Sequence, residues 1–268
     1  MPTLRLVQID AFSKSAFGGN PAAVMPLETW LEDHILQAIA VENNLSETAY
    51  YLPAQDDSEA DFELRWFTPG AEVAMCGHAT LATGHLLLSE NPDMDAVRFR
   101  TRKAGVLEVR RSDDGYELDL PITPVEPADR PDLLKALGTP DGEVFLSVAD
   151  SAEDTAIIRL SDDAAVRACS PDFKALADIH LMAIVTAEGA DTDVVSRVFV
   201  PAWGIDEDPV TGSAHAALTP FWAERLGRNS FSAFQASARG GHLGCRLDGD
   251  RAVLSGHCAT VIEGEFFF

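Results

Sequence analysis

The sequence predicts an α+β protein built from two similar halves, each combining β-strands with one central apolar helix. Three observations predict this class. Segments of alternating polar and apolar residues greatly outnumber helical segments, and the helices do not follow the strands in regular βαβ units. In addition, a series of short motifs occurs twice in the same order at nearly constant spacing, which indicates an internal duplication.

The expected strands are rich in β-branched and apolar residues and are bounded by Gly, Pro, Asp or Asn. Turn sequences at Asp113-Asp114-Gly115 and Asp248-Gly249 predict tight hairpins. The strand segments are Leu4–Ala11, Thr48–Leu52, Phe62–Phe67, Ala96–Arg102, Val106–Arg110, Tyr116–Leu120, Glu143–Ala149, Thr155–Leu160, Leu181–Thr186, Val194–Val200 and Ala252–Ile262.

Four segments predict helices. Thr29-Trp30-Leu31-Glu32 has the pattern of a capping box that opens a helix reaching about Val41. A second helix runs from about Gly77 to Ser89. A third runs from about Ser213 to Leu226, where Gly227 provides the C-terminal stop. A short fourth helix begins at Ser170-Pro171, because proline is favoured in the first helical turn.

The repeated motifs divide the chain into residues 1–120 and 121–268, with the C-terminal strand able to return to the first half. A cluster of prolines between Pro121 and Pro131 predicts a linker at the boundary. The offset between corresponding motifs drifts only from 132 to 136 residues, and it aligns Cys76 with Asp208. The matched pairs are Phe67–Pro69 with Phe199–Pro201, Gly77–Ala79 with Gly212–Ala214, and Gly105–Arg110 with Gly241–Arg246.

Charge and cysteine content exclude several partners. Lys and Arg number 20 against 43 Asp and Glu, for a formal charge of −23, so nucleic acid and anionic membranes are excluded as partners. No segment approaches the roughly 20 apolar residues of a membrane helix. The 4 cysteines form no CxxC pair, which is typical of reduced thiols in a cytoplasmic protein.

The two matched helix starts are the first candidate site. Gly77 and Gly212 open central helices whose free N–H groups and positive dipole ends attract anions, carboxylates above all. If the duplicated halves face each other across a cleft, a small carboxylate is the natural ligand between these ends. The alternative is that both glycines serve only helix packing.

Polar residues at these starts have two interpretations each. Cys76 is either an acid/base thiol with a pKa lowered by the helix end or a small buried apolar residue. His78 either donates to a substrate or is solvated, and Asp208 either caps the helix or orients a substrate amine or hydroxyl. By pattern alone Glu47 is an unremarkable surface acid, and Gly18–Pro21 is a plain loop.

No motif in the sequence predicts a cofactor or a metal. The chain has no HExxH, no zinc-type His/Cys spacing, no GxGxxG after a strand and no P-loop. We therefore expect a cofactor-independent and metal-independent enzyme, for which proton transfer is the natural chemistry.

Six blocks, in order along the chain, resemble the signature segments of the PhzF-like isomerases of phenazine biosynthesis. The blocks are Asp10–Phe12, Phe17–Val24, Ser46–Ala49, Phe67–Pro69, Cys76–Thr80 and Glu207–Ala214, and Gly240–Gly264 resembles the closing hairpin of that family. The resemblance implies a diaminopimelate-epimerase-like fold, in which each half is a curved sheet around a central helix and the active site lies in the cleft between them. It also implies a homodimer and an isomerase that needs no cofactor.

The resemblance implies roles for individual residues. The catalytic glutamate of the family matches Glu47, and its partners match His78, Asp208 and Ser213. Because related epimerases use two cysteines where this chain has Cys76 and Asp208, one-base isomerisation by Glu47 is favoured. The residues expected to bind the substrate carboxylate or to line the site are Gly19, Asn20, Cys76, Gly77, Gly212 and Ser213. The alternatives are an amino-acid epimerase or racemase that uses Cys76, and a non-catalytic member of the fold that binds a ligand or partner.

Overall fold

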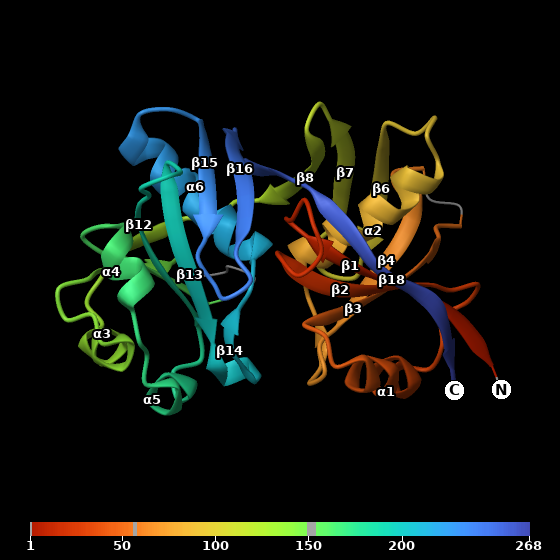
Figure 1. Ribbon diagram of the computed structural model, residues 1–268, viewed down its shortest axis with the longest axis horizontal. Helices are drawn as coiled ribbons and strands as arrows, with labels where there is room; N and C mark the ends of the chain where they lie inside the picture. Colours follow the sequence, from red (N-terminus) through yellow and green to blue (C-terminus); the bar gives the residue numbers. More distant parts are fainter. Residues whose placement is uncertain (1, 56–57, 149–153) are drawn as a thin grey trace. The chain divides into compact units, whose positions relative to one another are not determined.

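The computed structural model in Figure 1 describes residues 2–55, 58–148 and 154–268. The chain divides into two compact units. Unit 1 contains the chain up to Leu120 together with Ser255–Phe268, and unit 2 contains Pro121–Leu254. Along the described part of the chain, no helix is both long and apolar enough to cross a membrane.

Unit 1 is built on strands of mixed direction. The strands, in the order in which they pair, are β18 (Cys258–Phe267), β1 (Thr3–Ala11), β2 (Asn20–Pro26), β3 (Glu47–Pro53), β4 (Phe62–Phe67), β6 (Ala96–Thr101), β7 (Val106–Ser112) and β8 (Gly115–Pro121). The pairings of β2 with β3 and of β4 with β6 are parallel, and the other pairings in this order are antiparallel. The short β5 (Glu72–Val73) pairs with β4.

Unit 2 repeats this arrangement. Its strands, in the order in which they pair, are β9 (Val125–Ala128), β10 (Glu143–Ser147), β11 (Thr155–Arg159), β12 (Met182–Glu188), β13 (Val194–Val200), β15 (Ser230–Gln235) and β16 (Gly241–Asp248). The pairings of β11 with β12 and of β13 with β15 are parallel, and the other pairings in this order are antiparallel. The short β14 (Ile205–Asp208) pairs with β13 as β5 does with β4. The predicted α+β class with two duplicated halves is confirmed.

Each unit has one helix that is buried almost all round. In unit 1 this is α2 (Gly77–Glu90), with 11 of its 14 residues buried, and it packs on β1, β2, β3, β6 and β7. In unit 2 it is α6 (Gly212–Leu226), with 10 of 15 buried. Such helices carry little amphipathic pattern because their whole circumference is in the core. At Gly84 a Cβ atom would lie 2.4 Å from Cγ1 of Val109, so glycine permits the close approach of α2 to β7.

Helix α6 contains Pro220, which has no N–H to donate to the carbonyl of Ala216. The structure compensates from outside the helix, because the backbone N–H of Thr123 donates to that carbonyl at 3.4 Å. The helix therefore continues through the proline and ends at Leu226, where Gly227 adopts a left-handed φ of 64° as predicted.

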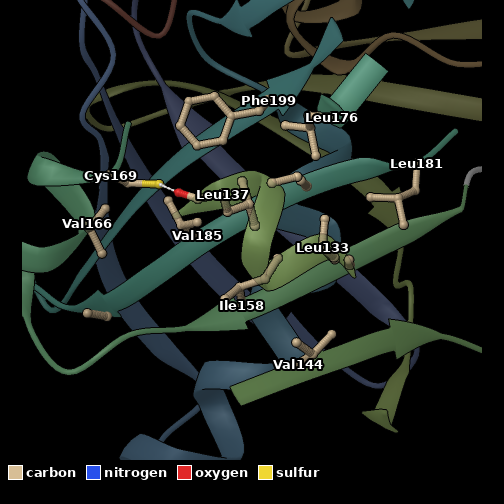
Figure 2. Packing of buried hydrophobic residues seen from close by; sticks show 14 of the residues in the cluster. Leu133, Leu137, Val144, Ile158, Val166, Cys169, Leu176, Leu181, Val185 and Phe199 are labelled. Atoms are coloured by element: carbon tan, nitrogen blue, oxygen red, sulfur yellow. Dashed lines mark hydrogen bonds between the residues drawn. The ribbon is translucent and has the colours of Figure 1, made fainter. Parts of the chain in front are cut away.

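The remaining helices form a second core in each unit. In unit 1, α1 (Asp33–Asn43) packs on a cluster that includes Met25, Tyr50 and Phe67, and the Tyr50 hydroxyl donates to the Leu36 carbonyl at 2.7 Å. In unit 2 three short helices together pack on the second core, as α1 alone does in unit 1, and Figure 2 shows their buried side chains. These helices are α3 (Pro131–Leu137), α4 (Asp163–Ala168) and α5 (Phe173–Ala177).

Two of the predicted helix starts are wrong. Helix α1 begins at Asp33, and its N-cap Glu32 makes no side-chain capping bond, so the capping box at Thr29 does not form. Helix α5 begins at Phe173 after the N-cap Asp172, whose carboxylate accepts from the Ala175 N–H, and not at Pro171. In both cases a capping motif in the sequence lay one turn or less before the actual start.

Two strand predictions and the linker prediction also need correction. The segment Ala252–Ile262 is split at His257 between β17 (Arg251–Gly256) and β18. The proline-rich segment expected to be a linker contains β9, whose Pro127 pairs with Phe145. The strand predicted over Glu143–Ala149 ends at Ser147, and Ala149 lies outside the described residues.

Candidate active site

Four of the predicted site residues meet inside unit 1. Asn20 and Glu47 are the first residues of the neighbouring parallel strands β2 and β3, which begin at the same edge because Ala22 is in register with Glu47. At this edge α2 begins, with Cys76 as the N-cap in extended conformation and His78 in the first turn. The parallel pairing of β2 with β3, rather than sequence proximity, brings Glu47 to the start of α2.

His78 is the centre of this group and uses both ring nitrogens. Its Nε2 lies 3.0 Å from Oε2 of Glu47. Its Nδ1 lies 3.2 Å from Nδ2 of Asn20 and 3.6 Å from Sγ of Cys76. The His78 side chain is 4% exposed, and the Glu47 side chain is 15% exposed. We call Asn20, Glu47, Cys76 and His78 the α2 cluster.

The two sides of the His78 ring have different partners. Nδ1 lies within hydrogen-bond distance of the Asn20 amide and the Cys76 thiol, whereas Nε2 faces the Glu47 carboxylate. Among the described residues neither Nε2 nor Oε2 of Glu47 has an aligned hydrogen-bond partner, so their contact is an off-axis ion pair. The Glu47 carboxylate therefore lies beside the imidazole without an aligned hydrogen bond between them.

Electrostatics in the cluster favour a protonated thiol. Burial raises the pKa of the Cys76 thiol to about 11, and the Glu47 carboxylate adds to this rise. Burial lowers the pKa of His78 and the Glu47 carboxylate raises it, and the net direction is upward. The interpretation of Cys76 as a thiol with a lowered pKa is contradicted, because burial outweighs the contributions of His78 and the Ala79 N–H that lower the pKa. The alternative interpretation, a small buried residue, agrees with its burial.

Glu47, Cys76 and His78 are also potential metal ligands by type, since each can present a ligand atom within 4.8 Å of the others. In this arrangement Cys76 faces Nδ1 of the ring and Glu47 faces Nε2.

The start of α6 in unit 2 carries the other predicted residues. Its N-cap is Thr211, in the same extended conformation as Cys76, and Gly212 and Ser213 correspond to Gly77 and His78. Asp208 ends β14 and precedes the N-cap by three residues. The alignment of Cys76 with Asp208 and the interpretation of Asp208 as a helix cap are therefore corrected: Thr211 holds that position.

A buried amide that the sequence did not single out organises this start. Gln235, at the end of β15, is 0% exposed. Its Oε1 accepts from the Thr211 N–H at 2.9 Å, and its Nε2 donates to the Asp208 carbonyl at 2.8 Å and to Thr211 Oγ1 at 3.2 Å. The Thr211 hydroxyl in turn donates to Oδ2 of Asp208. The alternation of Phe231, Ala233 and Gln235 inward along β15 is a signal that would have marked Gln235 as a buried polar residue.

His215, one turn into α6, is a second buried polar residue that was missed. Its Nδ1 donates to the Thr211 carbonyl at 2.8 Å. Within the described part of the chain, Nε2 has no hydrogen-bond partner. Burial lowers the pKa of His215 to about 4, so the ring is neutral at neutral pH.

The predicted residues thus fall into two groups. Gly19, Asn20, Glu47, Cys76, Gly77 and His78 are in unit 1, whereas Asp208, Gly212 and Ser213 are in unit 2. Gly19 has a structural reason for its identity, because its φ is 63° and a Cβ atom would lie 2.1 Å from the Ala11 carbonyl oxygen. Ser213 Oγ lies 4.0 Å from the sulfur of Met182.

Comparison with known proteins identifies the family. The family model described as "Phenazine biosynthesis-like protein" matches residues 9–264. The chain belongs to this family. An uncharacterized isomerase of Pseudomonas aeruginosa is 47% identical over 97% of both chains. The crystal structure of a phenazine biosynthesis PhzF-family protein from Enterococcus faecalis superposes with a TM-score of 0.87, at 37% identity and with 100% of both chains covered.

A more distant structure defines the fold. A hydroxyproline epimerase from Agrobacterium vitis, with bound trans-4-hydroxy-L-proline, has a TM-score of 0.64 at 15% identity, covering 98% of this chain and 92% of its own. The diaminopimelate-epimerase-like fold implied by the sequence blocks is confirmed. The family, together with its relative named as an isomerase, supports an enzyme of the isomerase type.

Proposed function

We propose that the protein is a cofactor-independent isomerase that moves a proton on a small carboxylate, with Glu47 as the acid/base group. The observation that carries this proposal is the position of the Glu47 carboxylate, 3.0 Å from the buried imidazole of His78 at the start of α2. Glu47 takes a proton from one carbon of the substrate and becomes a carboxylic acid. It then returns a proton to another carbon, and the electron pairs of the double bond shift accordingly.

The neighbours of Glu47 support this chemistry. The Nε2–H group of His78 stabilises the carboxylate form, and Asn20 and Cys76 hold the ring so that Nε2 faces Glu47. The free N–H groups of Gly77 and His78 at the positive end of α2 stabilise the negative charge that develops on the substrate. We also propose roles in ligand binding for Asp208, Gly212 and Ser213 at the start of α6. We further expect a homodimer as the working assembly.

Epimerisation by Cys76 and Glu47 is the competing proposal, and the distances in the α2 cluster count against it. Inversion needs one base on each side of a carbon, each about 3–3.5 Å from it, so the two bases must stand roughly 6–7 Å apart. Sγ of Cys76 and the ligand oxygen of Glu47 are within 4.8 Å. They can act on one face of a substrate but cannot enclose a carbon between them.

Deuterium incorporation into a set of probe carboxylates tests the proposal. The protein is incubated in D2O with cyclohexadiene carboxylates, with and without amino and hydroxyl groups, and with L-amino acids. We expect deuterium uptake with relocation of a double bond, lost in Glu47→Gln and kept in Glu72→Gln. Glu72 is a matched control because it is in unit 1 and pairs with Arg65. Inversion at one carbon without relocation would favour the epimerase, and no uptake with any probe despite ligand binding would favour the non-catalytic alternative.

A further inference from the structure

The hydrogen bonds around Asp208 define a fixed direction of donation. A side-chain amide can be placed in two orientations, but here both ends of Gln235 meet backbone groups whose roles are certain. The Thr211 N–H can only donate, and it meets Oε1 at 2.9 Å. The Asp208 carbonyl can only accept, and it meets Nε2 at 2.8 Å. The orientation of the Gln235 amide is therefore settled by chemistry.

That orientation determines the next two proton positions. Nε2 of Gln235 also approaches Thr211 Oγ1 at 3.2 Å, so the hydroxyl accepts from the amide. The hydroxyl hydrogen is then free to point at Oδ2 of Asp208, which accepts it. Oδ2 of Asp208 is thus an acceptor in this bond, which is the only role that the oxygens of an ionised aspartate can take.

The same contacts fix the backbone around Asp208. Ser237, two residues beyond Gln235, donates from Oγ to the Pro209 carbonyl at 2.8 Å. The segment after β15 thus holds the backbone at Asp208, Pro209 and Thr211. The Thr211 N–H already donates to Gln235. The N–H groups able to bind an anion at the start of α6 are therefore those of the first helical turn, beginning with Gly212.

We propose that Gln235 is a positioning residue: acting through Thr211, it holds Asp208 as an oriented, ionised hydrogen-bond acceptor at the start of α6. This inference concerns the arrangement of unit 2, and its catalytic consequence rests on the function proposed above. In this state Asp208 accepts a hydrogen bond from a donor group of a bound ligand and does not deliver a proton.

The first test measures the arrangement itself and needs no substrate. Amide hydrogen exchange followed by NMR is compared for the unmodified protein and Gln235→Met, which keeps the side-chain length and removes its polar atoms. Because Gln235 Oε1 is the partner of the Thr211 N–H, we expect exchange at Thr211 to become at least about tenfold faster. The control is Gln37→Met, since Gln37 holds a different loop by donating to the Thr68 and Pro69 carbonyls. It should leave exchange at Thr211 unchanged.

The second measurement follows the carboxyl carbon of Asp208 by 13C NMR at neutral pH. We expect the signal of an ionised carboxylate in the unmodified protein, and a displaced signal in Gln235→Met and in Thr211→Val but not in Thr211→Ser, which keeps the hydroxyl. Unchanged exchange at Thr211 in Gln235→Met, or a protonated Asp208 in the unmodified protein, would overturn the proposal. Both readouts stand even if no probe carboxylate takes up deuterium, so failure of the proposed function is told apart from failure of this inference.

With a probe that does take up deuterium, the catalytic consequence is measured directly. Misplacement of a substrate-orienting group by about 1 Å lowers rates on the order of 100-fold. We expect Gln235→Met to lower kcat/KM between roughly tenfold and 100-fold. Gln37→Met, as a purely structural change, should lower thermal stability without changing kcat/KM. Equal kcat/KM in both variants would limit Gln235 to a structural role.

Discussion

The starts of α2 and α6 occupy equivalent places in the two units and are built with similar backbones, yet their buried histidines are in opposite electrostatic states. His78 faces a carboxylate and its pKa is raised, whereas His215 faces a backbone carbonyl inside the core and its pKa is lowered to about 4. In α2, Thr80 takes the position of His215, and its hydroxyl donates to the Cys76 carbonyl at 2.6 Å just as His215 donates to that of Thr211. Duplication therefore preserved the backbone contacts of the helix start, while the chemistry diverged.

The largest expected effect concerns the charged side of this comparison. Glu47→Gln removes the acid/base group and leaves the shape of the α2 cluster intact, so we expect kcat to fall by roughly 10²–10⁴. The rate of deuterium uptake by a probe carboxylate measures this effect. A normal rate in Glu47→Gln would show that another residue is the base, and the contrast between the two helix starts would then not rest on Glu47.

His215 provides the next effect, in stability rather than rate. Its folded-state pKa of about 4 lies below the value near 6.5 expected for the unfolded chain, so the unfolded state binds more protons between these limits. The stabilising contribution is complete above about pH 6.5 and is lost as the pH falls toward 4, a change of roughly 3 kcal/mol in the free energy of unfolding. Urea unfolding across this range should show it. His215→Thr, which copies Thr80 of α2, should flatten that part of the profile.

His78 should give the opposite slope. Its raised pKa means that its contribution to stability is complete below about pH 6.5 and is lost as the pH rises through the folded-state value. Above pH 6.5 we expect the free energy of unfolding of the unmodified protein to fall with pH more steeply than that of His78→Asn. Parallel profiles for the two proteins in this range would show that Glu47 and His78 do not interact as an ion pair.

Cys76 is expected to have the smallest effect. With its thiol pKa at about 11, Cys76 remains protonated and serves to hold the ring of His78. Cys76→Ser keeps a hydroxyl donor there, so activity should remain within about tenfold of normal, the equivalent of one pKa unit of interaction energy. Cys245→Ser is a control for the loss of a buried thiol elsewhere. Complete loss of activity in a folded Cys76→Ser protein would revive the epimerase proposal.

The sequence was most informative where burial follows a simple period. The strands over Phe62–Phe67 and Val194–Val200 have the predicted bounds, and both central helices begin within one residue of their predicted starts. The false capping box at Thr29 shows the limit of local signals, because the Tyr50–Leu36 contact and the packing of α1 set where that helix lies. Local pattern cannot express such long-range contacts.

The candidate site was predictable only in part, for a similar reason. Glycine and small residues marked the helix starts, but Glu47 has no local feature that separates it from a surface acid. The register of β2 with β3 is what places Glu47 beside His78. The family resemblance, not the local pattern, predicted the role of this residue. Gln235 was missed because its importance depends on a neighbour 27 residues earlier in the chain, at Asp208.

The pairing of β1 with β18 has a consequence for the order in which the protein is made. Thr3 is in register with Phe267, so β1 is synthesised long before the strand with which it pairs. Unit 2 is one continuous stretch of chain, and only helix α3 separates its strand β9, the counterpart of β18, from β10. We therefore expect unit 2 to complete its strand pairing before unit 1, reversing the usual N-terminal-first order. Unit 1, which carries Glu47, cannot complete its sheet until β18 is available.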